Sequence, residues 1–237
     1  RLPRTAHHVN AAVVGDRIYV LGGMAGTSFT PFADSWSWQP SAAGGGSWQP
    51  VASLPTGSER GAAAVGVIDG AIHLAGGLAS GPVTTHHRYL PMTDSWELLP
   101  PLPAPRDHAC GGAIDGALVV AGGRDGDIAG IQASTFVYDE GAGWRSQADM
   151  PTARGGAACA VRDQQLLVIG GEGNAALPSG VFSEVEAYAL AADSWTSLPA
   201  MRTPRHGMAA AVIAGVVFVP GGATRAAFGA VDVHEAL

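Results

Sequence analysis

A pair of glycines that follows a short apolar run recurs five times and is the feature that most constrains the fold. The pairs begin at Gly22, Gly76, Gly122, Gly170 and Gly221, so the sequence repeats every 46 to 54 residues. A fixed period of this length indicates tandem structural units that stack on one another. The runs between turn residues are short and rich in β-branched and small apolar residues, and none sustains a helical period. The sequence therefore predicts five repeated all-β units.

Other residue types recur in phase with the glycine pairs. An arginine stands sixteen residues before four of the pairs, at Arg60, Arg106, Arg154 and Arg205, and Ala6 takes this place in the first unit. Trp96, Trp144 and Trp195 stand twenty-six residues before the last three pairs. In the fifth unit, the first two strands are expected at 208–213 and 216–219. Further strands are expected between each pair and the next tryptophan, at 35–39, 86–90, 133–139 and 184–190, which makes four short strands per unit.

This combination resembles the kelch repeat: a double glycine after an apolar strand, an aromatic residue in the next strand (Tyr89, Tyr138, Tyr188), and a tryptophan six or seven residues later. The resemblance covers nearly the whole chain. It implies an all-β, kelch-type β-propeller with five blades of four antiparallel strands around a channel, as a single domain over residues 1–237. By the repeat pattern, the sequence begins after an outer strand and stops at a third strand. Either the last blade has three strands, or residues beyond these ends complete it.

Charge and composition exclude some functions. The formal net charge of −7 argues against a nucleic-acid partner, since phosphate binding needs a basic surface. No uninterrupted apolar run is long enough for a membrane span. The glycine pairs are not followed by helices, which argues against a nucleotide cofactor, and no cofactor is predicted. Nothing in the sequence assigns a cellular compartment.

The two cysteines are expected to be buried thiols. Cys110 lies four residues after Arg106, whereas Cys159 lies five residues after Arg154. In aligned strands these side chains should point to opposite sides of their sheets. A disulfide is therefore not expected.

The strand order predicts where a ligand would bind. In an antiparallel blade, the loop after the second strand and the link into the next blade lie at the same end, so the glycine-pair loops and the Pro-Arg loops should share a face. Long loops on a rigid scaffold are the usual place for binding. The candidate ligand-binding residues are Arg60, Arg106, Arg154, Arg205, His8, His206, Arg124, Asn174 and Arg225.

The arginines have two interpretations. Guanidinium groups at equivalent places of four blades could form a partial ring that binds carboxylates or phosphates. Alternatively, they could donate to loop carbonyls and to a neighbouring acidic side chain. In kelch domains that bind peptides, arginines of these loops contact acidic partners. The resemblance therefore favours a binding module for a polar or anionic ligand, an acidic peptide or a carbohydrate, at the mouth of the channel.

A metal site and a catalytic site are weaker interpretations. His7, His8 and His206 occupy related loop positions and could converge on a transition metal, but their spacing matches no metal motif, so none is predicted. His73 is expected to be a hydrogen-bonded core histidine. Some kelch-like propellers are enzymes, and the alternative function is a carbohydrate-active enzyme of the sugar epimerase or isomerase kind. Its candidate acid and base groups are Glu172, Glu184, Asp107 and His108.

Overall fold

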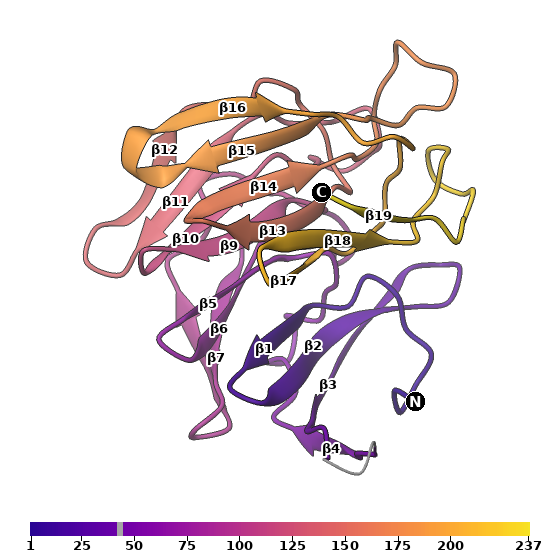
Figure 1. Cartoon of the computed structure of the whole chain (residues 1–237). Helices are drawn as coiled ribbons and strands as arrows, with labels where there is room; N and C mark the ends of the chain where they lie inside the picture. Colours follow the sequence, from indigo (N-terminus) through magenta and orange to yellow (C-terminus); the bar gives the residue numbers. More distant parts are fainter. Residues whose placement is uncertain (42–44) are drawn as a thin grey trace. The chain divides into compact units, whose positions relative to one another are not determined.

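The computed structural model describes residues 1–41 and 45–237, and nearly all regular structure within them is β (Figure 1). One 3-10 turn, Leu190–Ala192, precedes the strand that carries Trp195. The chain divides into two compact units, Arg1–Asp107 and His108–Leu237. Each unit consists of antiparallel sheets of consecutive strands. Among the described residues, no helix has the length and apolar character needed to cross a membrane.

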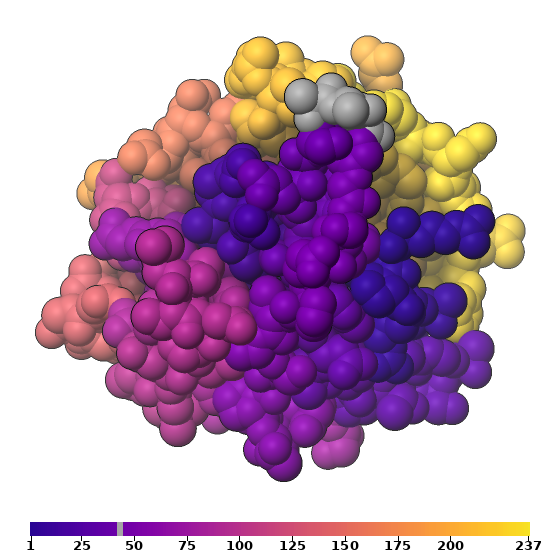
Figure 2. All heavy atoms as spheres, turned by 90° about the horizontal axis from the view of Figure 1, so that it is seen from below, coloured from indigo at the N-terminus to yellow at the C-terminus, as the bar shows by residue number. Residues whose placement is uncertain are grey.

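The first unit contains two four-stranded blades. Blade 1 consists of β1 (Ala11–Val14), β2 (Arg17–Ala25), β3 (Thr30–Trp38) and β4 (Trp48–Val51) in that order. Blade 2 consists of β5 (Ala64–Ile68), β6 (Ala71–Ala75), β7 (His86–Leu90) and β8 (Ser95–Leu99). In the space-filling view of Figure 2, the atoms of this unit run from indigo to magenta.

The second unit contains three blades. Blade 3 consists of β9 (Cys110–Ile114), β10 (Ala117–Ala121), β11 (Thr135–Asp139) and β12 (Gly143–Gln147). Blade 4 consists of β13 (Ala158–Arg162), β14 (Gln165–Ile169), β15 (Val185–Ala189) and β16 (Ser194–Leu198). Blade 5 has three strands, β17 (Ala211–Ile213), β18 (Val216–Pro220) and β19 (His234–Ala236).

Local sequence explains each blade. The first strands β5 and β9 alternate between buried and half-buried residues, as strands with two unequal faces do. The second strands β6 and β10 are buried along their whole length. Between β5 and β6, Asp69 and Gly70 both have positive φ, 48° and 79°, which is the conformation of a tight hairpin turn. The predicted five-unit, four-strand repeat is confirmed, with three strands in the last blade.

The glycine pairs are required by the close approach of the next arginine's backbone. Gly122 has φ +65°, and a Cβ built there would lie 2.7 Å from the carbonyl oxygen of Arg154. Gly170 meets the carbonyl of Arg205 in the same way. In these two pairs the second glycine donates its N–H to that same carbonyl, at 3.0 Å for Gly123 and 2.8 Å for Gly171. A side chain would therefore clash where the backbone of the following repeat must pass.

In blades 2 and 4, the tryptophan of the fourth strand joins the blade to the segment that precedes it. In blade 4, Trp195 lies opposite Tyr188 in the strand register, and their ring centroids are 5.2 Å apart. The Trp195 indole N–H donates to the carbonyl of Ala148, and Asp193 accepts bonds from the Tyr188 hydroxyl and from the Ala148 N–H. Blade 2 repeats this arrangement with Trp96, Tyr89, Asp94 and Ala52. The recurring aromatic residues therefore hold neighbouring repeats together.

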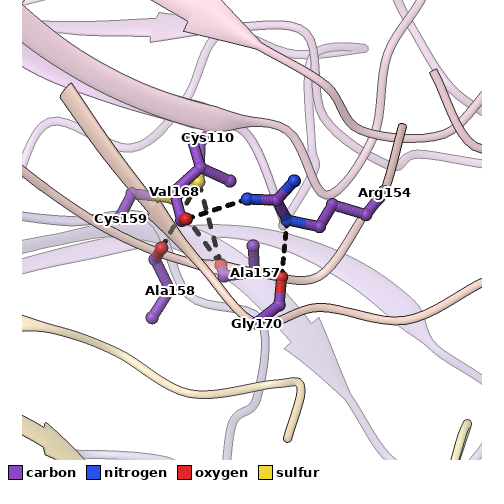
Figure 3. The surroundings of a disulfide bond; sticks show 7 residues. All are labelled: Cys110, Arg154, Ala157, Ala158, Cys159, Val168 and Gly170. Atoms are coloured by element: carbon purple, nitrogen blue, oxygen red, sulfur yellow. Dashed lines mark hydrogen bonds between the residues drawn. A yellow bond between two sulfur atoms is a disulfide. The ribbon is translucent and has the colours of Figure 1, made fainter. Parts of the chain in front are cut away.

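The expectation of two free thiols is wrong, because Cys110 and Cys159 form a disulfide (Figure 3). Their Cα atoms are 5.4 Å apart, on the first strands of blades 3 and 4. The side chains do point to opposite faces of their own sheets, as expected. In stacked blades, however, opposite faces of successive sheets are the ones that face each other. The different spacings of the two cysteines from their arginines, four and five residues, therefore place the sulfur atoms on facing sides of the two sheets, where they meet.

Candidate functional site

The glycine-pair loops and the Pro-Arg loops lie at the same end of four blades. In four repeats, the residue after the arginine position pairs with the residue that follows the glycine pair. These bridges join His7 to Met24, Gly61 to Leu78, Gly155 to Glu172, and His206 to Ala223. The prediction that the two kinds of loop share a face is confirmed within these blades.

Arg60, Arg154 and Arg205 are buried and bind the backbone. Their exposed fractions are 1%, 1% and 0%. The Nε of Arg154 donates to the carbonyl of Gly170 at 2.8 Å, and its Nη2 donates to Val168 at 2.9 Å (Figure 3). Arg60 repeats both bonds to Gly76 and Leu74, and Arg205 donates to Gly221 and Val219. This geometry matches the interpretation in which the arginines donate to loop carbonyls and brace the glycine pairs.

The third strand supplies a partner for each of these guanidinium groups. Glu186 on β15 lies 2.5 Å from Arg154, and Glu235 on β19 lies 2.9 Å from Arg205. In blade 2 the corresponding partner is His87, whose Nδ1 lies 3.4 Å from Nη2 of Arg60. Burial lowers the pKa of Arg60 to about 10, and burial also lowers the pKa of Arg154, where Glu186 opposes the shift. Sequence reasoning missed these partners.

A carboxylate in the second unit brings predicted site residues from three blades together. Glu172, from the glycine-pair loop of blade 4, is 4% exposed. Its Oε1 accepts a bond from Nη1 of Arg124, from blade 3, at 2.9 Å. Its Oε2 accepts the backbone N–H of Ala227, from blade 5, at 3.0 Å and lies 3.4 Å from Nδ1 of His206. Glu172 therefore ties the loops of blades 3, 4 and 5 to one another.

Each ring nitrogen of His206 contacts a loop of the second unit. Its Nε2 is 2.9 Å from the carbonyl oxygen of Arg225, and because a carbonyl only accepts, Nε2 donates to it. Its Nδ1 faces Oε2 of Glu172 at 3.4 Å. The bond from Nε2 holds the backbone of Arg225, and Arg225 itself is exposed.

The remaining predicted residues are distributed over both units. In the first unit, His7 and His8 approach each other at 2.5 Å between their Nδ1 atoms, and His7 also contacts the carbonyl of Gly26. Asn174 accepts the N–H of Ala176 and donates to Val181, so it shapes its own loop. Glu184 accepts the N–H of Ser183. Arg106 donates to the carbonyl of Pro105 and is buried, as is Asp107, while His108 is half-buried.

Buried polar residues outside the predicted set also link repeats. Asn10 is 1% exposed and donates to the carbonyls of Leu21 and Arg60, and its Oδ1 accepts the N–H of Ala63. His73 is fully buried against His86, with 3.0 Å between their ring nitrogens, which confirms it as a hydrogen-bonded core histidine. Among the residues that the structure describes, no group of three or more His, Cys, Asp or Glu residues could hold a metal ion.

The four-stranded, glycine-braced blades are those of a β-propeller. The solved structure of YjhT has the same fold, with a TM-score of 0.76 and 19% sequence identity over 93% of this chain and 73% of that one. The Kelch motif model matches residues 153–202, which is blade 4 with its Pro-Arg loop. The Kelch-like protein terF of Aspergillus terreus is 35% identical over 234 residues, or 93% of this chain. The motif match and this relative support a kelch-repeat family for the chain.

Other relatives are more distant or much longer. Beta-scruin of Limulus polyphemus is 33% identical over 144 residues, which are 58% of this chain and 15% of that protein. The chain spans about half the length of terF, since the match covers 50% of it. The kelch motif and the propeller fold together suggest a binding or protein-interaction module.

Proposed function

We propose that the loop-bearing end of the second unit binds an anionic ligand, and that this ligand is an acidic peptide of a partner protein. The observation that carries the proposal is the contrast between Arg225 and the framework arginines. Arg225 is exposed, whereas Arg154 and Arg205 are buried and bonded to carbonyls. Its backbone is held by His206, so this exposed arginine is anchored at a fixed point of the loop. A planar guanidinium matches the geometry of a carboxylate.

The braced loops reduce the cost of binding. Glu172 holds the loop of blade 5 through Ala227, and it bonds to Arg124 of blade 3. Loops that already have their bound shape lose less conformational entropy when a ligand docks. Among the predicted ligand-binding residues, Arg124 and His206 therefore support the surface from below, and Arg225 provides the contact.

The same geometry favours binding over sugar epimerisation. A general base needs a carboxylate oxygen that can take a proton from the substrate. Both oxygens of Glu172 already accept hydrogen bonds, Oε1 from Arg124 and Oε2 from the N–H of Ala227. Of the other carboxylates considered for catalysis, Glu184 accepts a backbone N–H. We therefore place the epimerase alternative second.

A charge-reversal experiment tests the proposal. A fluorescein-labelled peptide rich in glutamate should bind the protein in fluorescence anisotropy, and the affinity should fall as salt rises. Arg225→Glu should weaken binding by about tenfold or more, equivalent to about 1.4 kcal/mol. Arg145→Glu is the matched control, because Arg145 is an exposed arginine on β12, in the outer strand of blade 3.

The outcomes separate the candidate ligands. Equal loss of affinity in both variants would show only general electrostatic attraction and would contradict the proposal. Binding of a neutral oligosaccharide but not of the acidic peptide would point to carbohydrate recognition instead. Interconversion of sugar epimers, followed by proton NMR and abolished by Glu172→Gln, would establish the enzyme alternative.

A further inference from the structure

Large apolar side chains are exposed at the same position of three glycine-pair loops. The seventh residue after the first glycine is Phe29 in blade 1, Leu177 in blade 4 and Phe228 in blade 5. Their exposed fractions are 36%, 49% and 79%. Single exposed apolar residues are ordinary on protein surfaces. Their recurrence at one position of the repeat sets these three apart.

The two examples in the second unit lie on loops that are bonded to each other. The N–H of Ala226 donates to the carbonyl of Ser179 at 2.8 Å, which links the loop of blade 5 to that of blade 4. A Cβ added to Gly180 would lie 2.7 Å from the Cβ of Ala226, so the two loops are in close contact. Beneath them, Glu172 starts one loop and accepts the N–H of Ala227 in the other. Leu177 and Phe228 are therefore carried by one braced pair of loops.

These loops also share a chemical character. Residues 173–180 read GNAALPSG and residues 223–230 read ATRAAFGA, and Arg225 is the one charged residue in both segments. Arg225 stands three residues before Phe228 and is exposed with it. Aromatic and arginine side chains, surrounded by small residues, make up the energetic centres of many protein interfaces.

We propose that Leu177, Phe228 and Arg225 form a docking site for a partner-protein segment in which a bulky apolar residue stands beside acidic residues. This inference rests on the proposed function and adds the apolar contact that gives it specificity. The charge of the site decides the occupant, because the exposed Arg225 complements an acidic segment and repels a basic one, whereas the carboxylate of Glu172 beneath the loops is buried and paired with Arg124. A bulky apolar residue of the partner would cover Leu177 and Phe228, which are otherwise left in water.

Three labelled peptides of equal length provide the probes. The first has phenylalanine and leucine flanked by glutamate, the second has glycine in place of both apolar residues, and the third has lysine in place of glutamate. We expect the first to bind at least tenfold more tightly than the second in anisotropy titrations, and the third not to bind. Phe228→Ser and Leu177→Ser should each remove most of the advantage of the first peptide, with unchanged affinity for the second.

Met92→Ser is the matched control, because Met92 is 96% exposed and lies in the turn between β7 and β8, at the opposite end of a blade from the glycine-pair loops. Equal affinity for the first two peptides, both reduced by Arg225→Glu, would overturn the apolar site and leave the proposed function intact. No binding of any peptide would overturn both. A dimer seen by sedimentation and lost in Phe228→Ser would make a second copy of this chain the occupant and would also overturn the proposal.

Discussion

Blades 2 and 4 have the same strand order, and in both a buried arginine donates to carbonyls of the second strand and the glycine pair, an arrangement called the arginine clamp below. The two blades compensate the buried guanidinium in different ways. Arg154 of blade 4 has the carboxylate of Glu186 at 2.5 Å. Arg60 of blade 2 has the ring of His87 at 3.4 Å instead. Blade 2 also buries His73 and His86. The repeat therefore fixes the clamp through backbone carbonyls, and the third-strand partner is free to differ between blades.

Blades 2 and 4 should differ most in the unfolding free energy that is lost when the third-strand partner of the buried arginine is removed. Glu186→Ala leaves the buried Arg154 without its counter-ion, and such a loss costs about 3 to 5 kcal/mol of unfolding free energy. His87→Ala removes one neutral hydrogen bond from Arg60 and should cost about 1 to 2 kcal/mol. Urea titrations followed by tryptophan fluorescence measure both. Equal losses would show that the carbonyl bonds alone hold the clamp in both blades.

The disulfide adds a second difference, since it joins blade 4 to blade 3 and leaves blade 2 without a covalent link. Its closed loop spans a sequence separation of 49 residues. Loop closure of this length stabilises the folded chain by about 4 kcal/mol in the chain-entropy description, and typical measured values are about 2 to 4. A reducing agent should lower the thermal midpoint of the wild-type protein. The Cys110→Ala/Cys159→Ala variant should be less stable than the wild type and insensitive to reduction. An unchanged thermal midpoint of the reduced wild-type protein would contradict a stabilising disulfide.

Acid should destabilise blade 2 before blade 4. Burial lowers the pKa of His73 and His87 to about 4 and that of His86 to about 3, and the charges of Arg88 and Arg60 add to the shift. The carbonyl of Pro100 makes His86 donate from Nδ1, so its Nε2 accepts from His73 and has no place for another proton.

The direction of the pH effect follows from these lowered values. As pH falls below 6.5 the unfolded chain binds protons at these histidines and the folded chain does not, so stability decreases until pH reaches about 4 to 3. We expect a loss of roughly 2 kcal/mol between pH 7 and pH 5, after allowance for solvent screening. Hydrogen exchange read by mass spectrometry should show faster exchange in β6 and β7 than in β14 and β15. Uniform exchange in both blades would contradict this.

Much of the architecture could be predicted from the sequence because its causes are local and repeated. The glycine pairs, the Asp-Gly turns and the Tyr-Trp register each recur at nearly constant spacing, and the structure confirms them. The disulfide could not be predicted by comparing side-chain directions within single sheets. Its formation depends on which faces of neighbouring blades meet.

The site was harder to predict, because equivalent positions do not reveal what a side chain binds. Arg154 and Arg225 are both loop arginines in the sequence, but one binds carbonyls and the other is exposed. Glu186 and Glu235 escaped notice because loops of different length separate them from their glycine pairs. The exposed residues Leu177 and Phe228 did carry a signal, their constant distance from the glycine pair, which becomes informative only once their exposure is known.

Two arginines of blade 5 allow the most direct test of the claim that framework and binding surface use different side chains. Arg205→Met should lower the unfolding free energy by about 3 kcal/mol or more, because Glu235 and four carbonyls lose their donor. Arg225→Met should change it by no more than about 0.5 kcal/mol and should weaken binding of the glutamate-rich peptide. Full stability in Arg205→Met together with lost peptide binding, and unchanged binding in Arg225→Met, would contradict the account.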